Sequence, residues 1–269
     1  MHRRVGSSLF PPSRSPLHAS RPRSADLIAR PRARISACLL SWARPGNLAD
    51  IVANLRATAP SIDDIVVWNN DPAVQLDLPG VRVVASPENL VCLGRYRAAA
   101  LCRHDIVFTQ DDDWLPSNVE ALVRAFAVDG ARLTAAVPHL HRLAFQRRLR
   151  WGTAQMGLVG WGAVFDRRWL AVLDAYVGRF GEDALLRREA DRIFALLLDR
   201  EHRFLPRAGA ALPGAYRSAL SLQSDHWRHL DLAVERALAV LGRPRRPPLV
   251  ARLRRAVRPG AAVALRAGD

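Results

Sequence analysis

The pattern of apolar and polar residues along the chain predicts strands that alternate with helices. Residues 35–42 form a mostly apolar run, which is typical of a strand buried on both faces of a sheet. Residues 47–58 place apolar side chains on one face of a helix, and Asn47 can cap its N-terminus. Three more strands are expected over residues 65–68, 81–84 and 105–110, and a helix over residues 93–103.

A further helix is expected to start at Pro116, with Val119, Leu122, Val123 and Phe126 facing inward. The second half of the chain is less regular. It predicts strands over 131–138 and 153–165 and helices over 166–176, 182–200 and 224–241. Strands and helices that alternate at this spacing favour a single α/β domain with a mostly parallel sheet flanked by helices.

Composition divides the chain into a nearly neutral body, residues 35–242, and two basic tails. Each tail, 1–34 and 243–269, holds eight Arg and one acidic residue, so the tails carry +14 of the net charge of +15. The Pro-, Ser- and Arg-rich residues 1–34 are predicted to be disordered. Because the body has 24 Arg and 23 acidic residues, the charge gives no support to nucleic-acid binding by the folded part.

Residues 249–257 alternate Leu and Val with Arg at helical spacing. Such a helix would let the C-terminal tail contact an anionic membrane surface, and a solvated basic tail is the alternative. There are three Cys and no C-x-x-C motif, and no apolar run has the length of a membrane span. A cytoplasmic location, with peripheral contact at the inner membrane face, is therefore the expectation.

Polar clusters follow three of the predicted strands. Arg44 comes after the first strand, Asn69 and Asn70 after the second, and Asp111-Asp112-Asp113 directly after the fourth. In parallel α/β sheets, ligands bind beyond the carboxyl ends of the strands, so these side chains are expected to share one site. Since alternate residues of an extended chain share a face, Asp111 and Asp113 can converge on one cation. Carboxylate oxygens favour Mg²⁺ or Mn²⁺. The alternative is an acidic loop that caps the following helix.

Residues 35–206 resemble glycosyltransferases of the GT-A fold, most closely the exostosin-like family. The resemblance rests on five ordered pieces. They are Trp68-Asn69-Asn70, Gly94-Arg95-Tyr96, the DXD motif in Gln110-Asp111-Asp112-Asp113, the Gly-rich residues 157–165, and Glu189-Ala190-Asp191 with the helix that follows. It implies a Rossmann-like sheet and a hexosyltransferase that takes a sugar from a nucleotide-sugar donor, UDP-sugar favoured. The acceptor would be a glycan, a lipid-linked sugar or a small molecule.

The resemblance also implies roles for single residues. Arg44, Asn69, Asn70 and Arg95 would line the nucleotide pocket, and Asp112 would reach the ribose or the sugar. Asp113 would be the principal metal ligand, with Asp111 assisting. A late histidine often completes the metal site in these enzymes, and His226 is the candidate, with His229 as the alternative. A surface or capping histidine is the plainer interpretation.

Two acidic positions compete for the role next to the reacting sugar. Asp191 matches the acidic residue of the exostosin-like family, but the preceding residue is Ala190 where that family has Glu. Asp183, in Glu182-Asp183, instead resembles the general base of inverting enzymes. The two choices bear on whether the anomeric configuration is retained or inverted. Trp161 is the aromatic residue best placed to stack on an acceptor sugar, whereas Trp169 suits the core.

Two other functions fit part of the sequence. A nucleotidyltransferase also uses paired carboxylates on a metal, but it usually needs a glycine-rich phosphate loop after the first strand, and residues 41–46 make a poor one. A basic nucleic-acid-binding protein would depend on the two tails alone. A degenerate transferase that binds a donor without turnover is a third alternative, because of Ala190.

Overall fold

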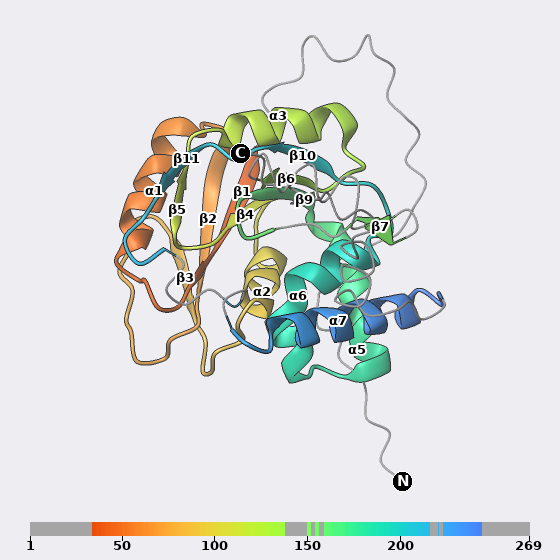
Figure 1. Cartoon of the computed structure of the whole chain (residues 1–269). Coiled ribbons are helices and arrows are strands. Elements are labelled where there is room, and N and C mark those ends of the chain that lie inside the picture. Colours follow the sequence, from red (N-terminus) through yellow and green to blue (C-terminus); the bar gives the residue numbers. More distant parts are fainter. Residues whose placement is uncertain are drawn as a thin grey trace, which may run out of the picture.

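The structure, a computed structural model, describes residues 34–137, 159–215 and 223–243, together with residues 150–151, 154–155 and 220. A seven-stranded sheet forms its centre, in the order β10-β6-β9-β4-β1-β2-β3 (Figure 1). The strands are β1 (Ile35–Ser41), β2 (Ile62–Asn69), β3 (Arg82–Ala85), β4 (Ile106–Gln110), β6 (Thr134–Val137), β9 (Ala163–Asp166) and β10 (Arg203–Pro206).

The sheet is mostly parallel, as the sequence predicted. β1 pairs in parallel with β2 and β4, β2 with β3, and β10 with β6. Only β9 runs antiparallel to its neighbours within this sheet, and it joins β4 to β6. The carboxyl ends of β1, β2 and β4 therefore lie at one edge, which brings the polar residues that follow them together.

Successive residues of the central strands point to opposite faces of the sheet, and both faces are buried. In β1, Cys38 packs in one core and its neighbours Ala37 and Leu39 pack in the other. The same alternation places Val107 and Phe108 of β4 in different cores. This explains why the strands appear as continuous apolar runs in the sequence.

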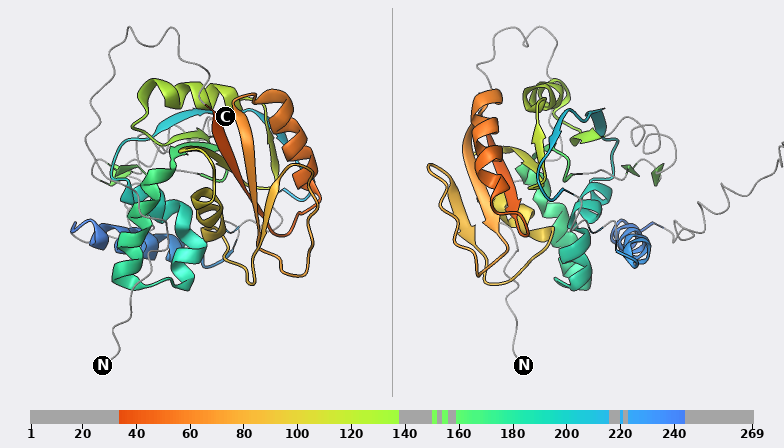
Figure 2. Two further views of the ribbon diagram at one scale, coloured as in Figure 1. Left: turned by 180° about the vertical axis from the view of Figure 1, so that it is seen from behind. Right: turned by 60° about the vertical axis from the view of Figure 1, so that its left-hand side comes forward.

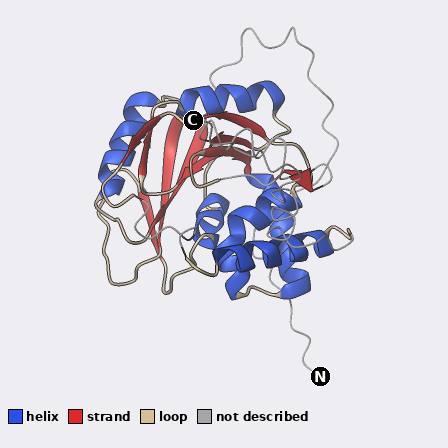
Figure 3. Cartoon of the chain, viewed as in Figure 1, coloured by secondary structure: helices blue, strands red, loops and turns tan. Residues whose placement is uncertain are grey.

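Helices cover both faces of the sheet (Figures 2 and 3). α1 (Asn47–Thr58) and α3 (Val119–Asp129) pack on one face. The other face is covered by α2 (Leu93–Ala100), α5 (Ala171–Phe180) and α6 (Ala184–Leu197), and α7 (His226–Val240) packs against α5 and α6. The arrangement is a single α/β domain of three layers, which confirms the predicted fold class.

Two predictions at helix starts are wrong. Pro116 ends a short strand, β5 (Trp114–Pro116), and α3 begins only at Val119. β5 pairs antiparallel with β11 (Gly209–Ala211), a strand that the sequence did not indicate. Asn47 does not cap α1, because its side chain donates to the backbone oxygens of Asp112 and Pro213, at 2.9 and 3.0 Å.

The long strand predicted over residues 153–165 is interrupted. The described parts are β8 (Ala154–Gln155), which pairs with β7 (Arg150–Trp151), and β9, which begins only at Ala163. Gly162, directly before β9, has φ +108°. This conformation favours glycine and interrupts the extended backbone. After β9, a short 3-10 helix, η2 (Arg167–Leu170), precedes α5.

Both predicted tails lie outside the described residues, apart from Arg34 and Arg243, and so does the amphipathic helix expected over 249–257. Within the described part of the chain, no helix has the length and apolarity required to cross a bilayer.

Candidate active site

Backbone contacts fix the loop Asp111–Asp113 between β4 and β5. The N–H of Asp111 donates to the oxygen of Gly160 at 2.7 Å, and the oxygen of Asp113 accepts from Leu212 at 2.9 Å. Asn47 holds the oxygen of Asp112, as described above. Each aspartate thus has its backbone tied to a different segment, so the three carboxylates project from a fixed frame.

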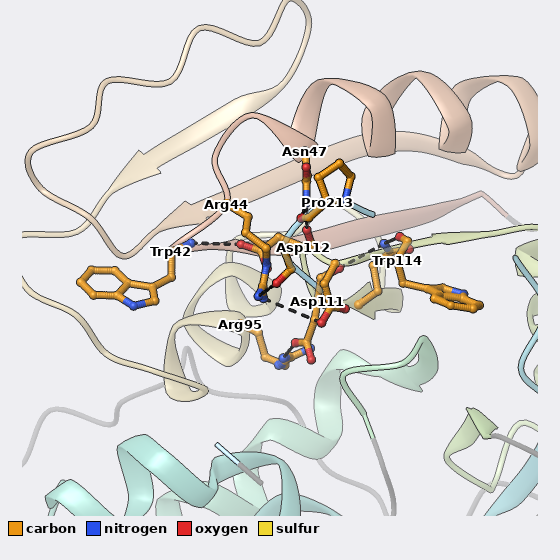
Figure 4. A network of polar contacts seen from close by, with 11 residues as sticks. Trp42, Arg44, Asn47, Arg95, Asp111, Asp112, Trp114 and Pro213 are labelled. Carbon is orange, nitrogen blue, oxygen red and sulfur yellow. Dashed lines mark hydrogen bonds and ion pairs between the residues drawn. The ribbon is translucent and has the colours of Figure 1, made fainter. Parts of the chain in front are cut away.

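Asp112 is locked by Arg44, which follows β1 (Figure 4). Nε and Nη2 of Arg44 both donate to Oδ1 of Asp112, at 2.8 and 2.5 Å, and the backbone N–H of Trp42 donates to Oδ2 at 3.4 Å. Burial raises the pKa of Asp112, and the charge of Arg44 opposes this shift. Arg44 also donates to the backbone oxygen of Gly214 at 3.2 Å, which fastens the segment after β11 over the loop.

Asp111 is linked to Asp191 through Arg95, on α2. The Arg95 side chain is 1% exposed. Its Nη2 contacts Oδ1 of Asp111, and its Nε lies 3.0 Å from Oδ1 of Asp191. The hydroxyl of Tyr96 donates to the same Asp191 oxygen at 3.0 Å. Burial raises the pKa of Asp191, and the positive charge of Arg95 opposes the rise. The buried guanidinium group of Arg95 therefore links Asp111 of the triplet to Asp191.

Gly160 allows Asp111 its position. A Cβ at Gly160 would collide with the Asp111 carboxylate, so a larger residue there would require this carboxylate to move. The Asp111 side chain is 37% exposed, whereas the Asp113 side chain is 14% exposed and lies 3.9 Å from Nη2 of Arg44. Asp112 is paired with Arg44 and Asp111 with Arg95, and the predicted role of Asp111 and Asp113 as metal ligands stays a prediction.

Asn69, the last residue of β2, and Asn70, which follows it, make side-chain hydrogen bonds within the protein. Asn69 is 1% exposed, donates to the oxygen of Val74 at 2.6 Å and accepts from the N–H of Asp71. Asn70 is fully buried, donates to the oxygen of Val91 at 3.0 Å and accepts from the N–H of Leu90. Both shape the turn after β2. Direct contact with a nucleotide stays a prediction, and it would require one of these bonds to be exchanged.

Asp183 and Asp191 have different surroundings. Asp183 caps α6 by accepting from the N–H of Leu186 at 2.9 Å, and its other oxygen pairs with Arg236. Asp191 instead lies against Arg95, next to the triplet. Glu189 is buried at a kink of α6, between Arg188 and Arg192, at 3.4 Å from each. The geometry favours Asp191 as the acidic group near the reaction, which stays a prediction.

His226 begins α7 and is 6% exposed. Burial lowers its pKa to about 4, and the charges of Arg192 and Arg188 act in the same direction. Among the described residues, no three His, Cys, Asp or Glu side chains are grouped so that they could hold one metal ion. The role of His226 as a metal ligand therefore stays a prediction.

Three residues near the site were not singled out by the sequence. Trp42, 43% exposed, follows β1. Trp114 follows Asp113, and the guanidinium carbon of Arg207 lies 3.5 Å from the centre of its ring. An aromatic residue next to a strand-end aspartate was visible in the sequence, but Arg207 could not be paired with it because 93 residues separate them. Trp169 packs on Phe126 in the core, as expected.

Comparison with known proteins supports the fold. No protein-family model matches the sequence, and no curated protein matches it. Among solved structures, a mannosyltransferase from Pyrobaculum calidifontis is similar over 78% of this chain and 74% of its own, at 14% identity and a TM-score of 0.54. A glucosyl-3-phosphoglycerate synthase from Mycobacterium tuberculosis is similar over 79% and 81%, at 14% identity and a TM-score of 0.45.

At these identities the likeness concerns the fold. The mostly parallel sheet with its antiparallel β9, covered by helices on both faces, is the Rossmann-like GT-A fold. The chain is thus an α/β protein of the GT-A fold with an aspartate triplet at the carboxyl edge of its sheet.

Proposed function

We propose that the protein is a metal-dependent glycosyltransferase that moves a sugar from a nucleotide-sugar donor to a glycan, lipid-linked or small-molecule acceptor. One observation carries the proposal. At the carboxyl end of β4, Arg44 pairs with Asp112, which lies between Asp111 and Asp113 in the chain, and Arg95 links Asp111 to Asp191. A GT-A fold alone would not support the activity, since a fold hosts many functions.

The carboxylate ligands that the site offers are of the kind that magnesium and manganese ions bind. Both ions accept carboxylate oxygens, and Mg²⁺ in particular often uses only one or two carboxylates together with substrate phosphates. Asp111 and Asp113 would supply the carboxylates, and this needs no third protein ligand. When bound, the ion would neutralise the charge that develops on the leaving diphosphate. The mannosyltransferase structure contains GDP-Man and Mn²⁺, which supports the same kind of donor and metal here.

The residues of the chain then have distinct tasks. Arg44 holds Asp112 and shapes the edge at which the nucleotide binds. Arg95 fixes Asp111 and Asp191 relative to each other, and Asp191 acts near the anomeric carbon. In the transfer, the acceptor hydroxyl oxygen bonds to the anomeric carbon as the bond from that carbon to the diphosphate oxygen breaks. The nucleoside diphosphate leaves with the electron pair, and the hydroxyl proton passes to a base or to solvent.

The finer assignments belong to the proposal as well. The motif at Trp68-Asn69-Asn70, the triplet and Asp191 support the exostosin-like family, and that family favours a UDP-sugar. Ala190 departs from its pattern. Peripheral membrane contact through the C-terminal tail would suit a lipid-linked acceptor.

A thermal-shift screen of nucleotide sugars, with and without Mn²⁺, tests the function. A donor that binds the folded state raises the melting temperature according to its concentration and affinity. We expect one class of nucleotide sugar, UDP-sugars first, to stabilise the protein only when the metal is present. Stabilisation by no nucleotide sugar, with or without Mn²⁺ or Mg²⁺, would contradict the proposal.

A further inference from the structure

Arg192, on α6, donates no hydrogen bond to any residue that the structure describes. Its side chain is largely buried, with 17% exposed, and its Nε is buried without a hydrogen-bond partner. Within the described part of the chain it makes one ion pair, in which Oε2 of Glu189 lies 3.4 Å from Nε. A buried donor without an acceptor costs free energy, and a ligand that accepts a hydrogen bond from it offsets this cost.

Glu189 is shared between two arginines, so it does not satisfy Arg192. This carboxylate is buried at the kink of α6, and Nε of Arg188 lies 3.4 Å from its other oxygen. Oε1 of Glu189 has no hydrogen-bond partner. Arg188 is engaged elsewhere, because its Nη1 donates to Gln223 and its Nη2 donates to Asp225 at 3.1 Å. Of the two arginines, Arg192 is therefore the one whose donors can bind a ligand.

The charge of Arg192 acts on two neighbouring titratable groups. Burial lowers the pKa of His226, and Arg192 is the charged group that lowers this pKa most. Burial raises the pKa of Asp191, and Arg192 is among the groups that oppose the rise, after Arg95 and Tyr96. Arg192 therefore lies near both Asp191 and the start of α7, and its charge there favours an anion.

The packing of α6 places Arg192 on the side of the site that faces away from the edge strand β3. In Figures 1 and 2, α2 lies between α6 and β3, and α6 packs against α2, α5 and α7. Asp191, directly before Arg192 in the chain, is joined through Arg95 to Asp111. If the nucleotide occupies the ends of β1 and β2, a group bound by Arg192 lies on the side left for the second substrate.

The geometry of a guanidinium selects the type of ligand. Its N–H donors lie in one plane and match two oxygens of a carboxylate or a phosphate, which accept parallel hydrogen bonds. Such an anion also compensates the charge of Arg192, which a neutral sugar hydroxyl does not. The negative charge of Glu189 next to Arg192 opposes anion binding, so the affinity depends on both side chains.

We propose that Arg192 binds an anionic group, a carboxylate or a phosphate, on the acceptor, beside Asp191. The word acceptor rests on the proposed function, but binding of an anion to Arg192 can be measured without turnover. Such a site would favour acceptors whose negative group lies near the hydroxyl that receives the sugar.

The test is calorimetric titration of the full chain with inorganic phosphate and, in a second series, with acetate, after saturation with UDP and Mg²⁺. The same titrations without UDP and Mg²⁺ separate this site from the donor site. We expect Arg192→Gln to weaken binding of the preferred anion at least about tenfold, because a charge-assisted bidentate contact is lost. A preference for phosphate or for acetate identifies the type of anion.

Glu189→Gln gives a second test, since it keeps Arg192 and changes the shape of the neighbouring side chain little. At about pH 8 the carboxylate of Glu189 is ionised, so its removal should strengthen anion binding. Damage to the kink of α6 would instead weaken binding in both variants. Unchanged or weaker binding in a folded Glu189→Gln protein would contradict the inference, also in the case that Arg192→Gln does not fold.

Arg124→Gln is the matched control, because Arg124 is an exposed arginine on α3, which packs on the other face of the sheet. It changes the net charge by the same amount and should leave anion binding unchanged. Absence of anion binding in the wild-type protein, or equal binding in wild type and Arg192→Gln, would overturn the inference. Failure of UDP and Mg²⁺ to bind would instead contradict the proposed function, so the two failures are distinguishable.

Discussion

Arg44 and Asp112 form a two-bond ion pair that ties the end of β1 to the end of β4. The pair is largely buried, with side-chain exposures of 17% and 6%. Removal of one partner from such a pair leaves an uncompensated buried charge, which is more costly than removal of both.

Arg44→Met is therefore expected to destabilise the protein by about 3 kcal/mol, and the melting temperature in thermal unfolding measures the effect. The double variant Arg44→Met/Asp112→Asn should recover part of the loss, since position 112 then carries no buried charge. Equal destabilisation in the single and double variants would show that the charge of Asp112 is not the cause.

Gly160→Ala is expected to displace the Asp111 carboxylate, because the new Cβ would occupy its place. Metal-dependent transfer should fall by about tenfold or more, in keeping with the sensitivity of active sites to small misplacements. Gly178→Ala is the control, since Gly178 lies in α5 with open space around it. That variant should keep the wild-type activity and have unchanged or slightly higher stability. Wild-type activity of a folded Gly160→Ala protein would contradict the assigned role of Asp111.

Arg95→Met is expected to change the pH dependence of the rate. Burial raises the pKa of Asp191 and Arg95 opposes the rise, so loss of Arg95 moves this pKa further upward. Asp191 then keeps its proton to higher pH, and the acidic limb of the pH–rate profile should shift to higher pH. Arg97→Met, on the same helix but paired with Glu182, should leave the limb in place. An unmoved limb in Arg95→Met would argue against ionised Asp191 in the reaction.

A stability measurement and a rate measurement together distinguish the role of Asp183 from that of Asp191. Asp183→Ala removes the cap of α6 and should cost about 1 kcal/mol of stability, with turnover retained. Asp191→Asn should retain the fold but lose most of the turnover. The reverse result, an inactive and stable Asp183→Ala protein, would support the inverting arrangement that the sequence left open.

The strands and the placement of the triplet were predictable because buried parallel strands are apolar throughout and end at polar residues. Ile35–Ser41 and Ile106–Gln110 show this directly. Pro116 was misinterpreted because proline suits both a helix start and the end of a short edge strand, and only the partner β11, about 90 residues away, decides between them. The local sequence around Pro116 does not show which distant segment pairs with it.

The site was predictable in its residue types but less so in its contacts. The spacing of Asp111 and Asp113 was visible in the sequence, and their role as metal ligands stays a prediction. The burial of Arg95 between Asp111 and Asp191, in contrast, depends on how α2 and α6 pack. Arg95 is buried, and its predicted contact with a nucleotide stays a prediction. The amides of Asn69 and Asn70 likewise bond to a turn whose closure the sequence could not reveal.

The central claim is that Asp111 and Asp113 hold a cation that binds the diphosphate of the donor. The most direct test is calorimetric titration of UDP into wild-type and Asp113→Ala protein, with and without Mn²⁺, with the exposed Asp50→Ala as control. We expect Mn²⁺ to strengthen UDP binding in wild type and Asp50→Ala, and this gain to be lost in a folded Asp113→Ala protein that also fails to transfer sugar. An equal Mn²⁺-dependent gain in Asp113→Ala would contradict the claim.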